Sequence, residues 1–97
     1  MTKYESMYIL DPTLEDEART ALIERFADIV KADGGEIESI DEWGKRKLAY
    51  PINYISEGYY VLMTFAAPST VPAELERNYR IVESVLRHVV IKKEAKL

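Results

Sequence analysis

Cysteine is absent from this chain of 97 residues, and His88 is its only histidine. Without cysteine the chain has no disulfide and no thiolate nucleophile, which is typical of proteins in a reducing compartment such as the cytoplasm. A metal site built on nitrogen or sulfur ligands needs several of them, and a single histidine supplies one. We therefore expect a cytoplasmic protein with no metal site and no cofactor.

Long apolar runs are also missing. No segment approaches the run of about eighteen apolar residues that a membrane span needs, and the first residues lack the apolar region of a signal peptide. With 47% hydrophobic and 31% charged residues, the composition is that of a folding chain and not of a disordered one. The sequence predicts one domain over residues 1–97, with no membrane among its partners.

Charge is divided unevenly along the chain. Up to Glu42 there are four cations and twelve acids, a net charge of −8, whereas the rest has nine cations and five acids, a net charge of +4. An overall charge of −4 argues against a protein that coats nucleic acid indiscriminately, because that affinity comes from many phosphate contacts. A localised basic face is compatible with these numbers, and so is ordinary variation of the surface.

Apolar periodicity predicts six elements. Strands are expected over residues 3–10, about 36–52, 59–66 and 86–93, with helices after the first and third strands. Thr13 is expected to cap the first helix and Gly34 to end it, and a bulge near Asp41 or Gly44 would restore the register of residues 36–52. This order predicts an α+β, ferredoxin-like βαββαβ domain, with a four-stranded antiparallel sheet, two helices on one face and the other face open.

Three consecutive cations, Lys45, Arg46 and Lys47, precede Tyr50 and Pro51. Such a stretch is typical of a strand edge that meets an anionic partner, although cations at an edge also prevent aggregation. The whole segment 44–52, GKRKLAYPI, resembles the signature of the family of the sixth protein of the bacterial small ribosomal subunit. The resemblance extends to residues 4–5, 34–35, 58–60, 75–77 and 85–88.

The resemblance implies a structural constituent of the bacterial small ribosomal subunit. Such a protein binds the central domain of 16S ribosomal RNA, at the platform, together with the eighteenth small-subunit ribosomal protein. A strongly basic partner of this kind would neutralise phosphates that an acidic protein leaves exposed, so the resemblance also accounts for the negative net charge. Binding to RNA without the partner is expected to be weak.

Candidate RNA contacts are cations of the basic motif and of the last part of the chain, together with Lys3, which would lie near the last strand if the first and last strands pair. The full set is Lys3, Lys45, Arg46, Lys47, Arg80, Arg87, Lys92 and Lys93. Candidate contacts with the partner protein are the aromatic residues Trp43, Tyr50 and Tyr60. Alternation puts Lys45 and Lys47 on one face and Arg46 on the other, and it separates Tyr59 from Tyr60. Solvated strand exits and plain core packing would account for the same residues.

The same architecture serves other classes of protein, so function has to be argued from residues. An acyl-phosphate hydrolase would need a cationic loop after the first strand, where Asp11 would repel phosphate, and paired acids such as Asp41 and Glu42 lack a neighbouring base or nucleophile. An RNA-recognition motif would need a Lys/Arg-Gly-aromatic pattern that the third strand lacks. We expect no enzyme and no small-molecule substrate; the alternative is a ferredoxin-like regulatory domain that binds a small molecule.

Overall fold

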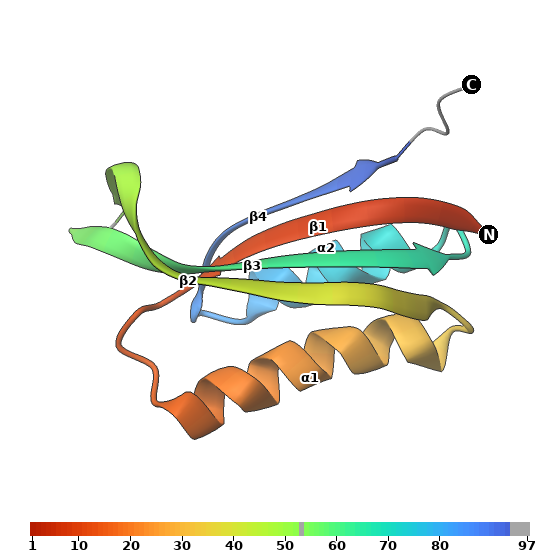
Figure 1. Ribbon diagram of the computed structural model, residues 1–97, viewed down its shortest axis with the longest axis horizontal. Coiled ribbons are helices and arrows are strands. Elements are labelled where there is room, and N and C mark those ends of the chain that lie inside the picture. The colour runs from red at the N-terminus through yellow and green to blue at the C-terminus, as the bar shows by residue number, and fades with distance from the viewer. Residues whose placement is uncertain (53, 94–97) are drawn as a thin grey trace.

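Strands and helices alternate in the predicted order, strand, helix, strand, strand, helix, strand (Figure 1). The computed structural model of the protein describes residues 1–52 and 54–93. The elements are β1 (Thr2–Leu10), α1 (Asp16–Ala32), β2 (Glu36–Ile52), β3 (Ile55–Ala67), α2 (Val71–Ile81) and β4 (Val85–Lys92). Within the described ranges, neither helix combines the length and the apolar character that crossing a membrane requires.

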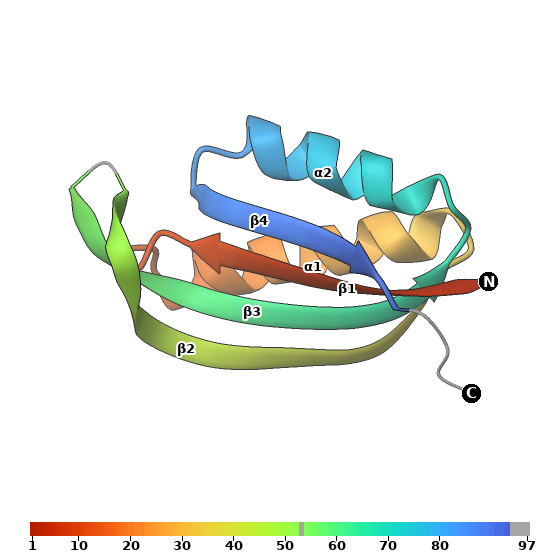
Figure 2. The same ribbon diagram turned by 90° about the horizontal axis from the view of Figure 1, so that it is seen from above.

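The four strands form one sheet in the order β2-β3-β1-β4, with antiparallel pairing between all neighbours. Both helices lie on the same side of this sheet, and the other side is open (Figure 2). The predicted ferredoxin-like fold is confirmed, with β1 in the interior of the sheet and β2 along one edge. The open face is therefore bounded by β2 on one side and by β4 on the other.

The core fills the space between the helices and the covered face of the sheet. Alternate residues of β1 are buried in it: Tyr4, Ser6, Tyr8 and Leu10. Phe26 of α1 and Tyr79 of α2 meet the Tyr8 ring, with ring centroids 5.0 and 5.2 Å away, and lie 4.7 Å from each other. These three rings join the sheet to both helices, and aromatic contacts of this kind stabilise more than their buried area alone.

The start of α1 differs from the prediction. The side chain of Asp11 accepts hydrogen bonds from the backbone N–H of Thr13 at 2.9 Å and from its hydroxyl at 2.7 Å, so Thr13 belongs to a turn. The helix begins at Asp16, with Glu15 as an N-cap residue whose side chain makes no capping bond. The prediction of Thr13 as the cap is wrong, whereas Asp16 and Glu17 do lie in the first turn, where the helix dipole favours acids.

The long strand β2 contains three irregularities in its pairing with β3, of which the last, between Lys47 and Ile52, lies in the hairpin. The register shifts between Ile37 and Ser39 and again between Glu42 and Gly44, whose φ of 83° is the left-handed conformation that glycine adopts without strain. The predicted bulge near Gly44 is confirmed, and the first one was not predicted. The first shift allows Ile37 and Ile40, which are out of phase in the sequence, to lie opposite Phe65 and Met63 on the covered side.

The connection between β2 and β3 is shorter than the sequence suggested. Turn-forming residues were expected over residues 53–58, of which Asn53 lies outside the described residues. Ile52 pairs directly with Ile55, and the strand β3 begins there, four residues before the predicted start. The two strands thus extend beyond the rest of the sheet as a hairpin, and its tip curls away from α1 toward the open face (Figure 1).

Alkaline pH is expected to destabilise the fold through two core tyrosines. Burial raises the pKa of Tyr8 and of Tyr79 far above the ordinary value of 10, although the hydrogen bond between the hydroxyls of Ser6 and Tyr79, at 2.5 Å, opposes the rise for Tyr79. Below pH 10 both hydroxyls are protonated in the folded and in the unfolded protein, so the free energy of unfolding has its full value. Above pH 10 only the unfolded chain releases these protons. The free energy of unfolding should then fall by about 1.4 kcal/mol per pH unit for each tyrosine.

Urea unfolding between pH 9 and pH 11.5 measures this loss. Within the described residues, the buried hydroxyl of Tyr8 has no hydrogen-bond partner, so Tyr8→Phe should preserve stability at neutral pH. The variant is expected to lose about half of the alkaline slope. A slope equal to that of the unmodified protein would show that Tyr8 does not cause the effect.

Candidate interaction face of the sheet

The side chains of the open face stand in rows that cross the four strands. Partners in the ladder share a face, so the register between strands identifies each row. Read from β2 to β4, three successive rows are Gly44, Tyr60, Ile9, Arg87; then Asp41, Leu62, Met7, Val89; then Ser39, Thr64, Glu5, Ile91. The middle of the face is therefore apolar, and charged residues lie toward its ends and edges.

A groove of about 290 Å³ runs over the apolar middle of this face. Its lining comes from all four strands: Glu5, Met7, Trp43, Leu62, Val89 and Ile91. About half of the surface of Val89 (51%) and of Ile91 (52%) is exposed to solvent. Neighbouring exposed apolar side chains on a monomer are typical of a surface that binds another molecule.

The second bulge of β2 places Trp43 beside this groove. The indole ring lies nearly parallel to the ring of Tyr60, with 6.4 Å between centroids and 7° between planes, and its N–H donates to Asp41 at 3.3 Å. The guanidinium carbon of Arg46 lies 5.5 Å from the indole centroid. Trp43 and Tyr60, two of the predicted partner contacts, are thus brought together on the open face.

Tyr59 points to the opposite side of the sheet from Tyr60, as alternation predicts. Its hydroxyl donates to Glu42 at 2.8 Å, and the guanidinium of Arg19 lies 4.3 Å from the centroid of its ring. Burial, followed by the bond to Glu42, raises the pKa of Tyr59. Tyr59 therefore belongs to the layer that the helices cover, and Tyr60 alone of the pair is available to a partner on the open face.

The hairpin closes one end of the open face. Leu48 is 8% exposed, because the curled hairpin carries it over Ile9, and Gly58 on the opposing strand provides the room. A Cβ atom at Gly58 would lie 2.2 Å from the Cγ2 atom of Ile9, so no other residue fits without movement of that side chain. Two residues beyond Leu48, Tyr50 contacts Arg87 of β4: the Arg87 Nη2 atom donates to the Tyr50 hydroxyl at 2.7 Å.

The eight predicted RNA contacts do not form a single patch. Alternation is confirmed in the basic motif: Lys45 lies opposite Tyr59 on the covered side, and Arg46 lies opposite Gly58 on the open side. Lys92 pairs with Tyr4 on the covered side at the edge, and Arg80 lies in the last turn of α2. Arg46 and Arg87 share the open face near the hairpin.

The predicted adjacency of Lys3 and the last strand is confirmed at the opposite end of the sheet. The backbone N–H of Lys93 donates to the carbonyl of Lys3 at 2.8 Å. Both ammonium groups have carboxylates nearby, with Lys3 at 3.6 Å from Glu38 and Lys93 at 3.9 Å from Glu5. In contrast, Lys45, Arg46, Lys47 and Arg87 form no ion pair with any described residue. Four cations without ion pairs among the described residues therefore gather at the hairpin end, and the other four, Arg25, Lys31, Arg80 and Lys92, are spread over the helices and β4.

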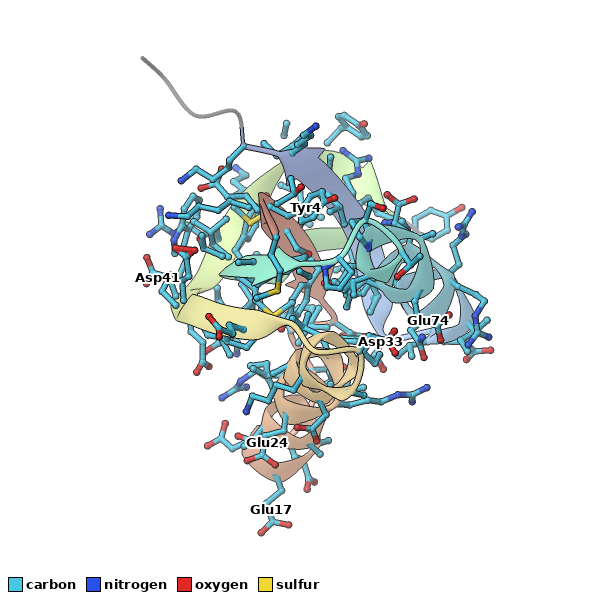
Figure 3. All side chains as sticks on the ribbon, turned by 90° about the vertical axis from the view of Figure 1, so that its right-hand side faces the viewer. Tyr4, Glu17, Glu24, Asp33, Asp41 and Glu74 are labelled. Carbon is cyan, nitrogen blue, oxygen red and sulfur yellow. The ribbon has the colours of Figure 1, made fainter. Side chains whose placement is uncertain are left out.

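The acids of the first half of the chain divide between α1 and the strands: of twelve, four lie in α1 and five in β1 and β2. Figure 3 shows Glu17 and Glu24 projecting from α1 away from the sheet, whereas Asp41 lies at the edge formed by β2. Only part of this charge is matched locally: Asp16 pairs with Arg19 at 2.5 Å within α1, and Glu38 and Glu5 pair with Lys3 and Lys93. In space, the three cations of the basic motif thus gather at the hairpin, whereas the acids are spread over α1 and over residues 36–42 of β2.

Comparison with known proteins shows similarity over nearly the whole chain. Residues 3–92 match the family described as ribosomal protein S6. Small ribosomal subunit protein bS6 of Caldanaerobacter subterraneus is 56% identical over 92 residues, covering 95% of this chain and 97% of that protein. The bS6 of Clostridium novyi is 49% identical, covering 97% and 99%. The crystal structure of 30S ribosomal protein S6 from Thermotoga maritima superposes with a TM-score of 0.89 at 32% identity, covering 95% of this chain and 87% of that one.

Proposed function

This chain belongs to the ribosomal protein S6 family, and we propose that it binds the central domain of 16S RNA, at the platform, together with the eighteenth small-subunit protein. Membership makes it a structural component of the small ribosomal subunit and not an enzyme. It works on the ribosome in the cytoplasm, with ribosomal RNA and ribosomal proteins as its partners. We propose, beyond this membership, the RNA region and the protein partner that the chain binds and the residues that bind them.

One observation above all supports the proposal that the protein partner and the RNA bind to two different surfaces of this chain. The open face combines an apolar groove with a hairpin whose cations have no carboxylate partners among the described residues. An apolar surface suits a protein segment, because burial of its side chains drives association. Cations without intramolecular partners suit phosphates, because each contact releases counterions from the RNA. The two kinds of surface adjoin at the row that contains Tyr60 and Arg87.

The protein partner is proposed to dock on the groove and on the stacked rings of Trp43 and Tyr60. Large aromatic side chains that are already packed lose little conformational freedom on binding, which suits them as anchors. Glu5, the only charged residue of the groove lining, and Asp41 beside Trp43 would complement a basic partner. The RNA is proposed to meet Lys45, Arg46, Lys47 and Arg87 first, with Arg80, Lys92 and the paired Lys3 and Lys93 at the periphery.

A mobility-shift titration tests the proposed assembly. An RNA fragment of the 16S central domain is titrated with this protein, with the eighteenth protein and with both. We expect weak binding of this protein alone and a stable ternary complex when both proteins are present. Indifference of the RNA to this protein, with and without the eighteenth protein, would exclude the proposed role.

A charge placed in the groove is expected to block the protein partner. Val89→Lys introduces an ammonium group at a half-exposed position of the lining, where docking would bury it against a basic partner. We expect the affinity for the eighteenth protein to fall at least about thirtyfold, measured by calorimetry without RNA. Ile81→Lys is the matched control, because Ile81 is 60% exposed on α2, outside the open face. Equal losses for both variants would show that the groove is not the docking surface.

A further inference from the structure

Tyr50 and Arg87 form a contact between two parts of the chain that sequence reasoning did not connect. They are separated by 37 residues in the sequence. The guanidinium carbon of Arg87 lies 4.8 Å from the centroid of the Tyr50 ring, and its Nη2 atom donates to the hydroxyl of the same residue at 2.7 Å. The tyrosine thus contacts the arginine both through its ring and through its oxygen, which fixes the direction as well as the position of the guanidinium.

The hairpin that carries Tyr50 is itself held in place. Leu48 lies on the same side of β2 as Tyr50, two residues earlier, and is buried over Ile9. Ile9 is the ladder partner of Arg87, so the anchor of the hairpin and the arginine occupy adjacent positions on the sheet. Because both ends of the contact rest on ordered strands, the side chain of Arg87 is fixed before any ligand arrives. A free arginine side chain would lose about 2 kcal/mol of rotamer entropy when it is immobilised.

The guanidinium of Arg87 has further N–H donors that a ligand from solution can reach. A guanidinium has five N–H donors, and within the described residues this one makes a single hydrogen bond and no ion pair. Tyr50 is 57% exposed, so the stacked pair is open to solvent. Planar guanidinium groups with free donors bind phosphate oxygens in a bidentate manner.

We infer that Tyr50 is a positioning residue that holds Arg87 as a preformed site for a backbone phosphate of the RNA. This inference rests on the proposed function, and it deepens the account of the same surface. An RNA phosphate fits the surroundings better than a carboxylate of the partner protein does. The neighbouring hairpin carries three further cations without ion pairs to described residues, Lys45, Arg46 and Lys47, and such a group matches a polyanion. Tyr50 then contributes to RNA affinity through Arg87 and not as an anchor of the protein partner.

The test is a double-mutant cycle measured in the ternary mobility shift at several salt concentrations. Arg87→Ala should weaken RNA binding roughly tenfold and lower the salt slope by about one, as expected for one lost phosphate contact. Tyr50→Phe keeps the ring and removes the acceptor, so it should weaken binding about threefold and leave the salt slope unchanged. In the Arg87→Ala background, Tyr50→Phe should have no further effect.

Two controls separate this role from a general change of the surface. Tyr54→Phe removes a hydroxyl from a fully exposed tyrosine of the same hairpin, and Arg77→Ala removes a cation from α2; neither should alter affinity more than marginally. The inference is overturned if Tyr50→Phe costs as much without Arg87 as with it. It is also overturned if Arg87→Ala leaves the salt slope intact and instead weakens binding of the two proteins without RNA, because that result identifies a carboxylate as the ligand. Failure of the unmodified proteins to bind the RNA overturns the proposed function together with this inference.

Discussion

Replacing Lys45, Arg46 and Lys47 together with alanine is expected to weaken the ternary complex with RNA about a hundredfold at physiological salt. The three cations have no ion pairs with described residues, so their charge is available to phosphates. Lys45 and Lys47 share one side of β2 and Arg46 the other, which lets at least two of them contact one strand of RNA. The slope of log affinity against log salt should therefore decrease by about two. Thermal unfolding should shift little, because all three residues are exposed.

A triple variant with the same change of net charge provides the comparison. Arg25, Lys31 and Arg77 are exposed cations of the helix layer, which the proposal keeps away from the RNA. Replacing these three with alanine should change the long-range field equally but preserve most of the affinity. If the two triple variants bind RNA with the same affinity and the same salt slope, net charge governs binding and the basic motif has no special part in it.

Replacing Phe26 with alanine is expected to be the most destabilising single change in the protein. The side chain is fully buried and meets Tyr8 and Tyr79 edge-on, at interplanar angles of 72° and 71°. Its removal leaves a cavity where the sheet and both helices join, which should cost about 4 kcal/mol of the free energy of unfolding. For a domain of this size that is a large part of the total stability. Equilibrium unfolding in urea measures the loss as a lower midpoint at unchanged slope.

Phe26→Leu and Ile81→Ala calibrate that result. Leucine retains most of the buried apolar volume, so its cost should be about 1 kcal/mol. Ile81 is 60% exposed on α2, and its truncation should change stability by less than about 0.5 kcal/mol. A loss for Phe26→Ala no larger than that for Ile81→Ala would mean that the three rings do not hold the layers together.

The order and sidedness of the strands were predictable because these properties are local. Alternation along residues 3–10 identifies Tyr4, Ser6, Tyr8 and Leu10 as one face without any knowledge of neighbours, and they are buried together. The apolar stripe of α1 was less predictable. Helical spacing indicates a stripe of Leu14, Ala18, Leu22, Phe26, Ile29 and Val30, but Ala18 is exposed, and Ile23, which is not in that set, is buried. A stripe is about 100° wide, so positions at its margin depend on what packs there, which the sequence does not contain.

Features that depend on competition between local contacts, or on pairing between distant segments, were not predictable. Thr13 is a residue type that often caps helices, but its hydroxyl donates to the carboxylate of Asp11, and the helix begins later, at Asp16. The cations and aromatic residues of the candidate site could be named from their types and from the family resemblance. The groove required the register of all four strands, and its floor residues Met7 and Leu62 are unremarkable in the sequence. The contact between Tyr50 and Arg87 depends on the curl of the hairpin in the same way.

The gathering of three cations at the hairpin of a molecule whose net charge is −4 gives the molecule an electric polarity. In the field of a polyanion such a molecule experiences a torque as well as an attraction, so it turns hairpin-first before the surfaces touch. Collisions in the opposite orientation are repelled by the outward carboxylates of Glu17 and Glu24. This selection of orientation extends only over a Debye length, about 8 Å in physiological salt, and therefore belongs to the last moments of the encounter.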